Sequence, residues 1–291
     1  MRVYMRRRDW GDERALVRRA RRLFGAPAPL QWLRTRGVRT DPVRDGGVRG
    51  EWIVAQRSDP GAILYLHGGG YVAGSAATHR PITAGLARLA RRRVFSLDYR
   101  LAPEHRFPAA LDDAVAAYRW LLAQGVSQPF LALAGDSAGG GLVLCTLLRL
   151  RDEGLPLPAC AVCFSPWTDL AGTGQSLQLN DGRCATFRPR NIAEFARAYL
   201  GGASPLNPYA SPVFADLGGL PPLLLQVGST ELLLDDARRV HDKVRSAGGV
   251  SRLEVFDDMF HVWQMLDGLM PEARVALQQA ATFMNGPPPV G

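Results

Sequence analysis

Most of the chain alternates between short apolar runs and segments with helical periodicity, beginning near residue 48. Several of the runs are continuously apolar, which is typical of strands buried on both faces of a sheet. Strands that alternate with helices favour a mainly parallel sheet with helices packed on both sides. We therefore predict an α/β fold, with strands at 50–56, 62–68, 93–99, 130–136, 159–165, 222–228 and 252–258, and helices near 80–91, 109–124, 138–152, 235–247 and 272–284.

Two stretches interrupt this alternation. Residues 1–46 are rich in arginine and contain the helical pattern DERALVRRARRLF, and residues 170–210 contain the helical pattern NIAEFARAYLGG between loop-like flanks. Both stretches are longer than a simple connection between elements requires. We interpret 1–46 as an N-terminal cap segment and 47–291 as the main domain, within which 170–210 is a cap insert over one end of the sheet.

The charge balance does not indicate a nucleic-acid partner. The 291 residues carry a formal net charge of +8, but Lys243 is the only lysine, and the basic residues are scattered apart from RRR at 6–8 and 91–93. No aromatic residues interleave with the basic ones, as a protein that binds single strands would require. We therefore expect no nucleic-acid binding.

Targeting signals and disulfides are not evident either. The basic start MRVYMRRRDW is not followed by an apolar stretch, and no run approaches the ~20 apolar residues of a membrane span. We expect a cytoplasmic protein without stable membrane insertion. Of the four cysteines, Cys160 and Cys163 lie in the apolar run ACAVCF, so we interpret this C-x-x-C pair as buried strand thiols rather than a redox or zinc site.

A serine between glycines follows one of the predicted strands. Gly135, Ser137 and Gly139 form the pattern G-x-S-x-G in AGDSAGGG, between the run FLAL and a helical pattern. A sharp strand-to-helix turn of this kind exposes a serine hydroxyl above the sheet, and its strained backbone needs neighbours without side chains. The following helix start directs backbone N–H groups toward the hydroxyl. We predict Ser137 as a nucleophile.

A second glycine motif supports this prediction. YLHGGGYVAGS follows the predicted strand at 62–68, and a run of three glycines leaves main-chain N–H groups free to converge. Acyl transfer needs such donors where the carbonyl oxygen becomes negative. A phosphate-binding loop would want a helix and a lysine directly after the glycines, and neither is present. We predict Gly69, Gly70 and Ala138 as the donors of an oxyanion hole.

The base can be found by elimination, because a serine hydroxyl needs a proton acceptor and histidine is the usual one. For a G-x-S-x-G turn on this kind of sheet the chain order is serine, acid, histidine, which leaves His241 and His261. His241 lies in the charged helical pattern DDARRVHDKVRSAG and is interpreted as a surface residue. His261 follows the last predicted strand, near the carboxyl edge of the sheet, and is our predicted base.

The acid is expected just after the preceding strand, in STELLLDDARR. Glu231 lies in that loop and is favoured; it would hold the imidazole tautomer and stabilise the imidazolium. Asp235 and Asp236 lie at the start of the next helix, where capping and the helix dipole explain acidic residues equally well. They stay open as alternatives.

Together, HGGG, GDSAGG, DYRLAPEHRFPAALDDA and FHVW resemble the hormone-sensitive-lipase-like branch of the α/β-hydrolases, over roughly residues 50–285. The resemblance implies an α/β-hydrolase fold whose catalytic domain is covered by a helical cap. It implies Ser137 as nucleophile, His261 as base and the acid at Glu231, where many members carry aspartate. It also implies the oxyanion hole named above and allows a homodimer.

Four more residues of these motifs carry expectations. We expect Tyr71 and Asp136, which adjoin the glycine loop and the serine, to bind substrate. We expect Arg100 and Glu104 of YRLAPEH to pair with each other and brace the glycine loop.

The function expected from the sequence is hydrolysis of a small-molecule carboxylic ester with a short acyl chain, since no large lid is evident. The chemistry needs no metal and no cofactor. A lactone or amide hydrolase with the same groups is the first alternative. A non-catalytic ligand receptor on this fold is the second, and the presence of His261 disfavours it.

Overall fold

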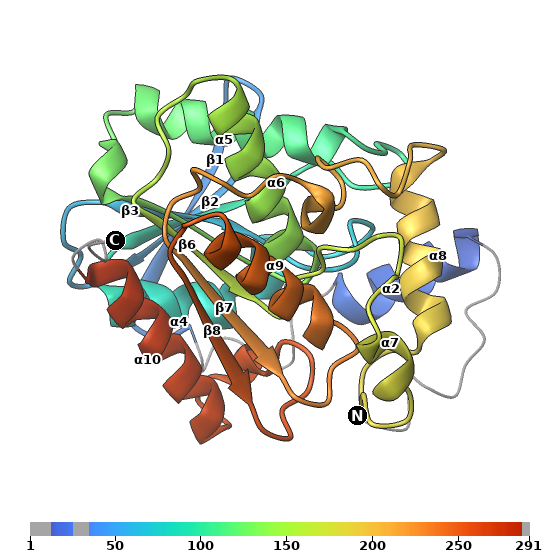
Figure 1. Cartoon of the computed structure of the whole chain (residues 1–291). Helices are drawn as coiled ribbons and strands as arrows, with labels where there is room; N and C mark the ends of the chain where they lie inside the picture. The colour runs from blue at the N-terminus through green and yellow to red at the C-terminus, as the bar shows by residue number, and fades with distance from the viewer. Residues whose placement is uncertain (1–12, 26–34, 287–291) are drawn as a thin grey trace.

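The computed structural model describes residues 13–25 and 35–286, which contain an eight-stranded sheet with helices on both faces (Figure 1). The strand order is β1-β2-β4-β3-β5-β6-β7-β8. The pairs β1–β2 and β2–β4 are antiparallel, and every other neighbouring pair is parallel. The strands are β1 Val38–Asp45, β2 Val48–Ala55, β3 Ala62–Leu66, β4 Arg93–Leu97, β5 Leu131–Asp136, β6 Cys160–Phe164, β7 Leu223–Gly228 and β8 Ser251–Phe256.

The central strands are apolar because both of their faces are covered. Every residue of β3, β5, β6 and β7 is buried. The uninterrupted apolar runs that predicted them reflect this two-sided burial, and the predicted mainly parallel sheet is confirmed.

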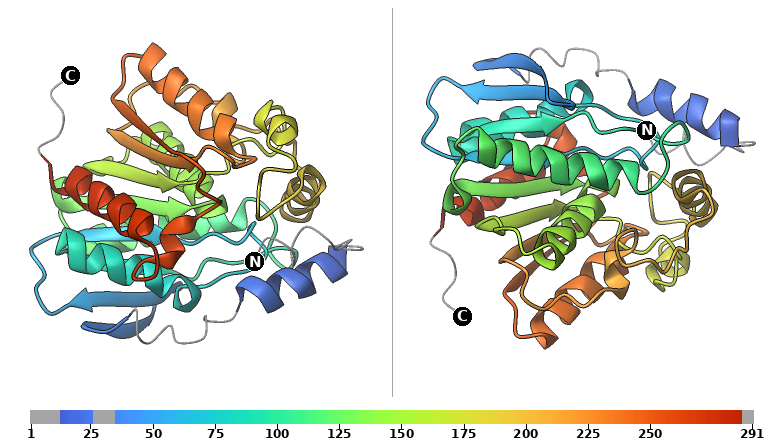
Figure 2. Two further views of the ribbon diagram at one scale, coloured as in Figure 1. Left: turned by 90° about the horizontal axis from the view of Figure 1, so that it is seen from below. Right: turned by 90° about the horizontal axis from the view of Figure 1, so that it is seen from above.

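The helices cover the two faces unequally (Figure 2). Residues of α4 and α10 pack in one apolar cluster with one face of the sheet, and residues of α5, α6 and α9 pack in another with the opposite face. The five helices expected from the sequence are all present. They are α4 Arg80–Ala90, α5 Ala109–Ala123, α6 Ala138–Asp152, α9 Leu234–Ser246 and α10 Pro271–Asn285, and short 3₁₀ helices occur at Ala77–His79, Gln128–Phe130, Pro212–Phe214 and Trp263–Leu266.

Three further helices gather at one end of the sheet, where the sequence predicts a cap (Figures 1 and 2). They are α2 Glu13–Phe24 from the N-terminal segment, and α7 Ser176–Leu179 and α8 Pro189–Leu200 from the insert at 170–210. The helices α2 and α8 contact each other although they are far apart in the sequence.

Residues 38–45, which the sequence predicts as part of the N-terminal cap segment, form the edge strand β1. The strand was missed because its sequence, VRTDPVRD, is charged, contains a proline and has no buried run. Charges and proline are typical of edge strands, which have one side exposed to water. The segment turns back into β2 through Gly46 and Gly47, both with positive φ. Residues 1–12 and 26–34 of the predicted cap segment lie outside the described residues.

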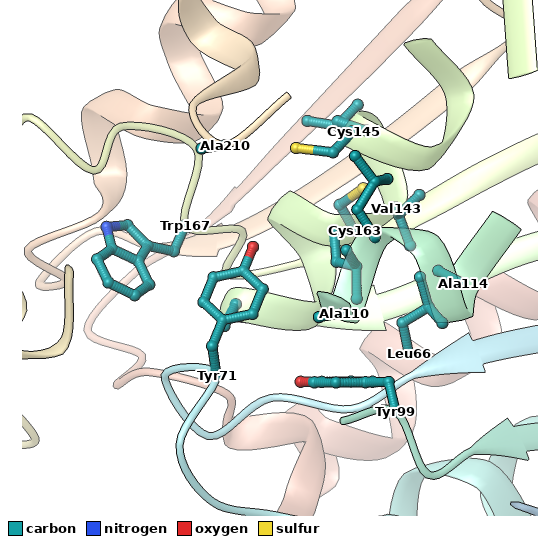
Figure 3. Close-up of a cluster of buried hydrophobic side chains, with 14 of the residues drawn as sticks. Leu66, Tyr71, Tyr99, Ala110, Ala114, Val143, Cys145, Cys163, Trp167 and Ala210 are labelled. Atoms are coloured by element: carbon teal, nitrogen blue, oxygen red, sulfur yellow. The ribbon is translucent and has the colours of Figure 1, made fainter. Parts of the chain in front are cut away.

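The buried core reaches from the sheet into the cap (Figure 3). The four cysteines are free and buried, and Figure 3 shows Cys145 and Cys163 among apolar side chains, as expected for strand and helix thiols. In the ranges that the structure describes, no helix combines the length and the apolar character needed to cross a bilayer.

Candidate active site

The sheet brings the predicted site residues to a single edge. Strands β3, β5, β6, β7 and β8 are consecutive neighbours and run parallel, so their carboxyl ends lie together. The glycine loop follows β3, Ser137 follows β5, Glu231 follows β7 and His261 follows β8. Ligand sites of open α/β sheets form at this edge.

Ser137 occupies the strained turn that the G-x-S-x-G pattern predicts. Its φ is 54° and its ψ is −122°, a conformation that L-residues rarely adopt. A β-carbon at Gly139 would collide with the backbone carbonyls of Leu66 and His67, so the close approach of α6 to β3 requires glycine there. The turn is also tied to the end of β6, because the Ser137 amide donates to the Phe164 carbonyl at 2.8 Å.

A continuous hydrogen-bond chain links serine, histidine and glutamate. His261 Nε2 lies 2.8 Å from Ser137 Oγ, and His261 Nδ1 lies 2.6 Å from Glu231 Oε2. A carboxylate only accepts hydrogen bonds, so Nδ1 carries the hydrogen and Nε2 offers its lone pair to the serine hydroxyl. This tautomer can take a proton from Ser137.

Glu231 is fully buried and held on both oxygens. Its Oε1 accepts hydrogen bonds from the Gly228 amide at 2.6 Å and from Ser165 Oγ at 2.7 Å, while Oε2 faces His261. The side-chain amide of Asn180, in the cap insert, donates to the backbone carbonyl of Glu231 at 2.8 Å. Sequence reasoning missed Ser165 and Asn180, because neither lies in a glycine motif or beside a histidine.

The two alternative acids hold backbone amides in the cap insert and in the segment just before it. The Asp235 carboxylate accepts the Ser176 amide at 2.8 Å, and the Asp236 carboxylate accepts the amides of Thr168 and Asp169 at 2.7 and 2.8 Å. Burial raises the pKa of Asp236 to about 7. Within the described residues, the carboxylate that contacts His261 Nδ1 belongs to Glu231.

Two amides of the glycine loop and one at the start of α6 have no acceptor within the described residues. Gly69 and Gly70 have φ of 120° and 63°, and the Gly69 carbonyl accepts the Val72 and Ala73 amides at 3.2 and 3.1 Å. Ala138 is the first residue of α6, where a backbone N–H has no acceptor inside the helix. In residues 13–25 and 35–286, no protein acceptor takes a hydrogen bond from the amides of Gly69, Gly70 or Ala138.

Asp136 does not face open space, in contrast to its expected role in substrate binding. It is 2% exposed, and its Oδ1 accepts the Tyr65 hydroxyl at 2.6 Å and the Gly68 amide at 3.0 Å. Its Oδ2 lies 3.4 Å from His79 Nε2. Burial alone would raise the pKa of Asp136, but the neighbouring His79 and the hydrogen bonds lower it. The Asp136 carboxylate therefore links the glycine loop to the end of β5, directly before Ser137.

Tyr71 is likewise buried rather than directed at substrate space, with 1% of its surface exposed. Its ring stacks on Tyr199 of α8 with centroids 3.7 Å apart, and Figure 3 shows it among Trp167, Tyr99 and Cys145. This stack joins the glycine loop to the cap helix.

The predicted pair of Arg100 and Glu104 is wrong. Arg100 pairs with Asp113 at 2.8 Å, and Glu104 accepts Arg21 Nη1 of α2 at 2.8 Å. Arg21 Nε also donates to the Val72 carbonyl at 2.9 Å. The hydrogen bond from Arg21 lowers the pKa of Glu104 to about 2. The YRLAPEH loop is thus braced by the cap helix α2 rather than from within.

Aromatic side chains of the cap cover the histidine. Phe187 meets the His261 ring edge to face, with centroids 5.4 Å apart. Phe24 of α2 and Phe195 of α8 pack against Phe187 at 6.2 and 6.1 Å. No group of three or more histidine, cysteine or acidic side chains in the described ranges is arranged to hold a metal.

Comparisons with known proteins identify the family of this chain. A family model described as alpha/beta hydrolase fold matches residues 63–265, so the chain is an α/β-hydrolase. An acetyl-hydrolase of Streptomyces hygroscopicus is 46% identical over 245 residues, covering 84% of this chain and 82% of that protein. An esterase of Acinetobacter venetianus is 38% identical over 247 residues, covering 84% and 82%.

Solved structures narrow the class. An esterase from the bacterial hormone-sensitive lipase family is 44% identical, with a TM-score of 0.86 over 97% of this chain and 93% of that one. EstE5, in a crystal soaked with p-nitrophenyl butyrate, is 42% identical, with a TM-score of 0.83 over 94% and 97%. The chain belongs to the hormone-sensitive-lipase-like branch of the α/β-hydrolases and is a carboxylesterase.

Proposed function

We propose that this carboxylesterase cleaves esters of short acyl chains, with Ser137 as nucleophile, His261 as general base and Glu231 as the acid of the triad. The observation that carries the assignment is the unbroken hydrogen-bond chain from Ser137 Oγ through His261 to Glu231. Its members come from three different strands and meet in one site, which coincidence does not readily produce.

The reaction follows from the positions of these groups. His261 Nε2 takes the Ser137 proton as Oγ attacks the ester carbonyl, and the amides of Gly69, Gly70 and Ala138 donate to the oxygen that becomes negative. The tetrahedral intermediate collapses, and His261 returns the proton to the departing alcohol. A water molecule then attacks the carbonyl carbon of the acyl-enzyme while His261 takes its proton. His261 returns this proton to Ser137 Oγ, and the carboxylic acid product leaves.

Short acyl chains fit the surroundings of His261. Phe187 meets the His261 ring edge to face, and Phe24 and Phe195 pack against Phe187, so we propose that this cluster limits the length of the acyl chain. The name of the acetyl-hydrolase relative and the butyrate ester soaked into EstE5 support the same substrate class. The two comparisons are independent of the triad assignment, whereas the packing around His261 bears on the substrate only if His261 is the base.

Two measurements test the proposal. Ser137→Ala should abolish hydrolysis of p-nitrophenyl butyrate while leaving the circular dichroism spectrum unchanged, and retained turnover would refute Ser137 as nucleophile. A series of p-nitrophenyl esters from acetate to palmitate should peak at short chains. A maximum at palmitate would refute the substrate class, and faster cleavage of lactones or amides than of any ester in the same panel would favour those substrates instead.

A further inference from the structure

Ser165 lies at the centre of the active-site edge, directly after β6. Its amide donates to the Gln226 carbonyl of β7 at 2.6 Å, which fixes its backbone between two strands. The carbonyl of the preceding residue, Phe164, accepts the Ser137 amide at 2.8 Å. The side chain of Ser165 is fully buried, and its φ is 46°, in the left-handed region. A serine in this conformation, at this place, needs an explanation beyond packing.

Its hydroxyl makes two hydrogen bonds whose directions are determined by their partners. Ser165 Oγ lies 2.7 Å from Glu231 Oε1, and the Val262 amide nitrogen lies 3.1 Å from the same Oγ. A carboxylate accepts and a backbone N–H donates, so the hydroxyl gives its hydrogen to Glu231 and receives one from Val262. Val262 directly follows His261 in the chain.

We propose that Ser165 is a positioning residue whose single hydroxyl group holds the Glu231 carboxylate and the backbone next to His261 in place relative to each other. The proposal rests on the proposed roles of Glu231 and His261. On the acid side, Ser165 and the Gly228 amide occupy Oε1, so that Oε2 stays directed at His261 Nδ1. On the base side, the hydroxyl accepts the Val262 amide and so fixes the backbone that carries the imidazole.

Removing the hydroxyl therefore affects both partners. Glu231 is fully buried, so an oxygen that loses a donor has no surrounding solvent to replace it. Oε1 keeps the Gly228 amide but loses one of its two donors, so the carboxylate is held less firmly and Oε2 is less well directed at His261 Nδ1. The Val262 amide loses its acceptor at the same time, which frees the backbone next to His261.

Two variants and one matched control test this role. Ser165→Ala keeps a β-carbon in the left-handed conformation, and Ser165→Gly relieves that conformation, but both remove the hydroxyl. Ser96→Ala is the control, because Ser96 is also fully buried while its Oγ has no hydrogen-bond partner in the described residues. Steady-state kinetics with p-nitrophenyl butyrate would be normalised by titrating Ser137 with an organophosphonate, so that only correctly folded sites are counted.

Both Ser165 variants should lower kcat by about 10- to 100-fold, which corresponds to the usual free energy of a hydrogen bond to a charged group. KM should change by less than about twofold. Ser96→Ala should match the wild type. If Ser165→Ala does not fold, Ser165→Gly carries the test. A wild-type kcat in a folded Ser165 variant would overturn the proposal.

A double-mutant cycle distinguishes positioning of the triad from a general structural role. Residues that act through one another lose additivity, so Ser165→Ala should lower kcat by a smaller factor when Glu231 is already replaced by Gln, because only the contact with the Val262 amide is then left to lose. A full additional loss in that background would also overturn the proposal. If Ser137→Ala retains turnover, the proposed function itself has failed; if Ser137→Ala is inactive while Ser165→Ala is normal, only the role of Ser165 has failed.

Discussion

His79 and Asp136 form a buried pair behind the glycine loop, with His79 Nε2 3.4 Å from Asp136 Oδ2. The other ring nitrogen, Nδ1, lies 2.9 Å from Thr78 Oγ1, whose own hydrogen is donated to the Ser75 carbonyl at 2.9 Å. Both nitrogens of His79 therefore face acceptors, which requires a proton on each. Burial alone would lower the pKa of His79, but the Asp136 charge outweighs it and raises that pKa.

This pair predicts a pH-dependent contribution to stability. The folded-state pKa of His79 is raised above 6.5, so its contribution is complete below pH 6.5 and is lost as pH rises through the folded-state pKa. The pKa of Asp136 is lowered from 3.8, so its contribution is present above pH 3.8 and is lost as pH falls through the lowered value. Between these limits the pair contributes fully.

We expect His79→Gln to lower the free energy of unfolding by about 3–5 kcal/mol near pH 5.5, the usual loss when one partner of a buried pair is removed. The loss should be smaller near pH 9. Urea unfolding at the two pH values measures it. His241→Gln is the control, since His241 is only partly buried and hydrogen-bonds to Ser251. An equal loss at both pH values would show that folding does not raise the pKa of His79.

The stack of Tyr71 on Tyr199 predicts that the cap helix stabilises the glycine loop. Tyr199→Ala removes a buried ring from this contact and should cost about 3–5 kcal/mol of unfolding free energy. It should also lower kcat/KM, because Tyr71 directly follows Gly70 of the proposed oxyanion hole.

Tyr199→Phe keeps the stacked ring and is the matched control. It should stay within about 1 kcal/mol of the wild type, as expected for a swap that preserves volume. Thermal unfolding and p-nitrophenyl butyrate kinetics on both variants measure the effect. Equal stability of the alanine variant and the wild type would show that the stack contributes nothing.

Much of the fold could be predicted because its signals are local. A few consecutive residues are enough to predict a buried strand from the apolar run AILYL in β3. The same holds for the strand-to-helix turn at Ser137, which glycines flank after β5. The base was found by elimination for a similar reason, since chain order left only two histidines. By contrast, β1 has a polar edge-strand sequence that differs little from a loop, and its strand character comes from pairing with β2.

The residues that support the site could not be predicted because their roles depend on contacts between distant segments. Ser165 is 66 positions from Glu231 and 97 from Val262, and nothing in the sequence around it indicates either partner. Asp136 was assigned to substrate because it adjoins Ser137. Strand alternation turns adjacent side chains to opposite faces of a sheet, and Asp136 instead meets Tyr65 and His79.

Phe187 predicts how acyl-chain preference can be altered. Its ring lies edge to face on His261, so Phe187→Ala opens space beside the base. The ratio of kcat/KM for p-nitrophenyl octanoate to that for acetate should rise by about tenfold, the scale of discrimination that one hydrophobic pocket contact provides. Phe130→Ala is the control, because Phe130 is 50% exposed and lies before β5, away from the site. An unchanged ratio would show that Phe187 does not limit the acyl pocket.

Replacement of Glu231 tests which carboxylate is the acid of the triad. Glu231→Gln preserves the size of the side chain but removes the charge that faces His261 Nδ1, and it can support the wrong imidazole tautomer. We expect kcat to fall by about 10⁴-fold, as for amide replacements of the acid in other serine triads. Asp235→Asn and Asp236→Asn should each keep kcat within about tenfold, because these carboxylates hold backbone amides in and just before the cap insert and do not contact the histidine. Steady-state kinetics of the three variants, each checked for folding by circular dichroism, decide the assignment. Loss of turnover in Asp235→Asn or Asp236→Asn, with turnover retained in Glu231→Gln, would assign the acid to the start of α9 instead.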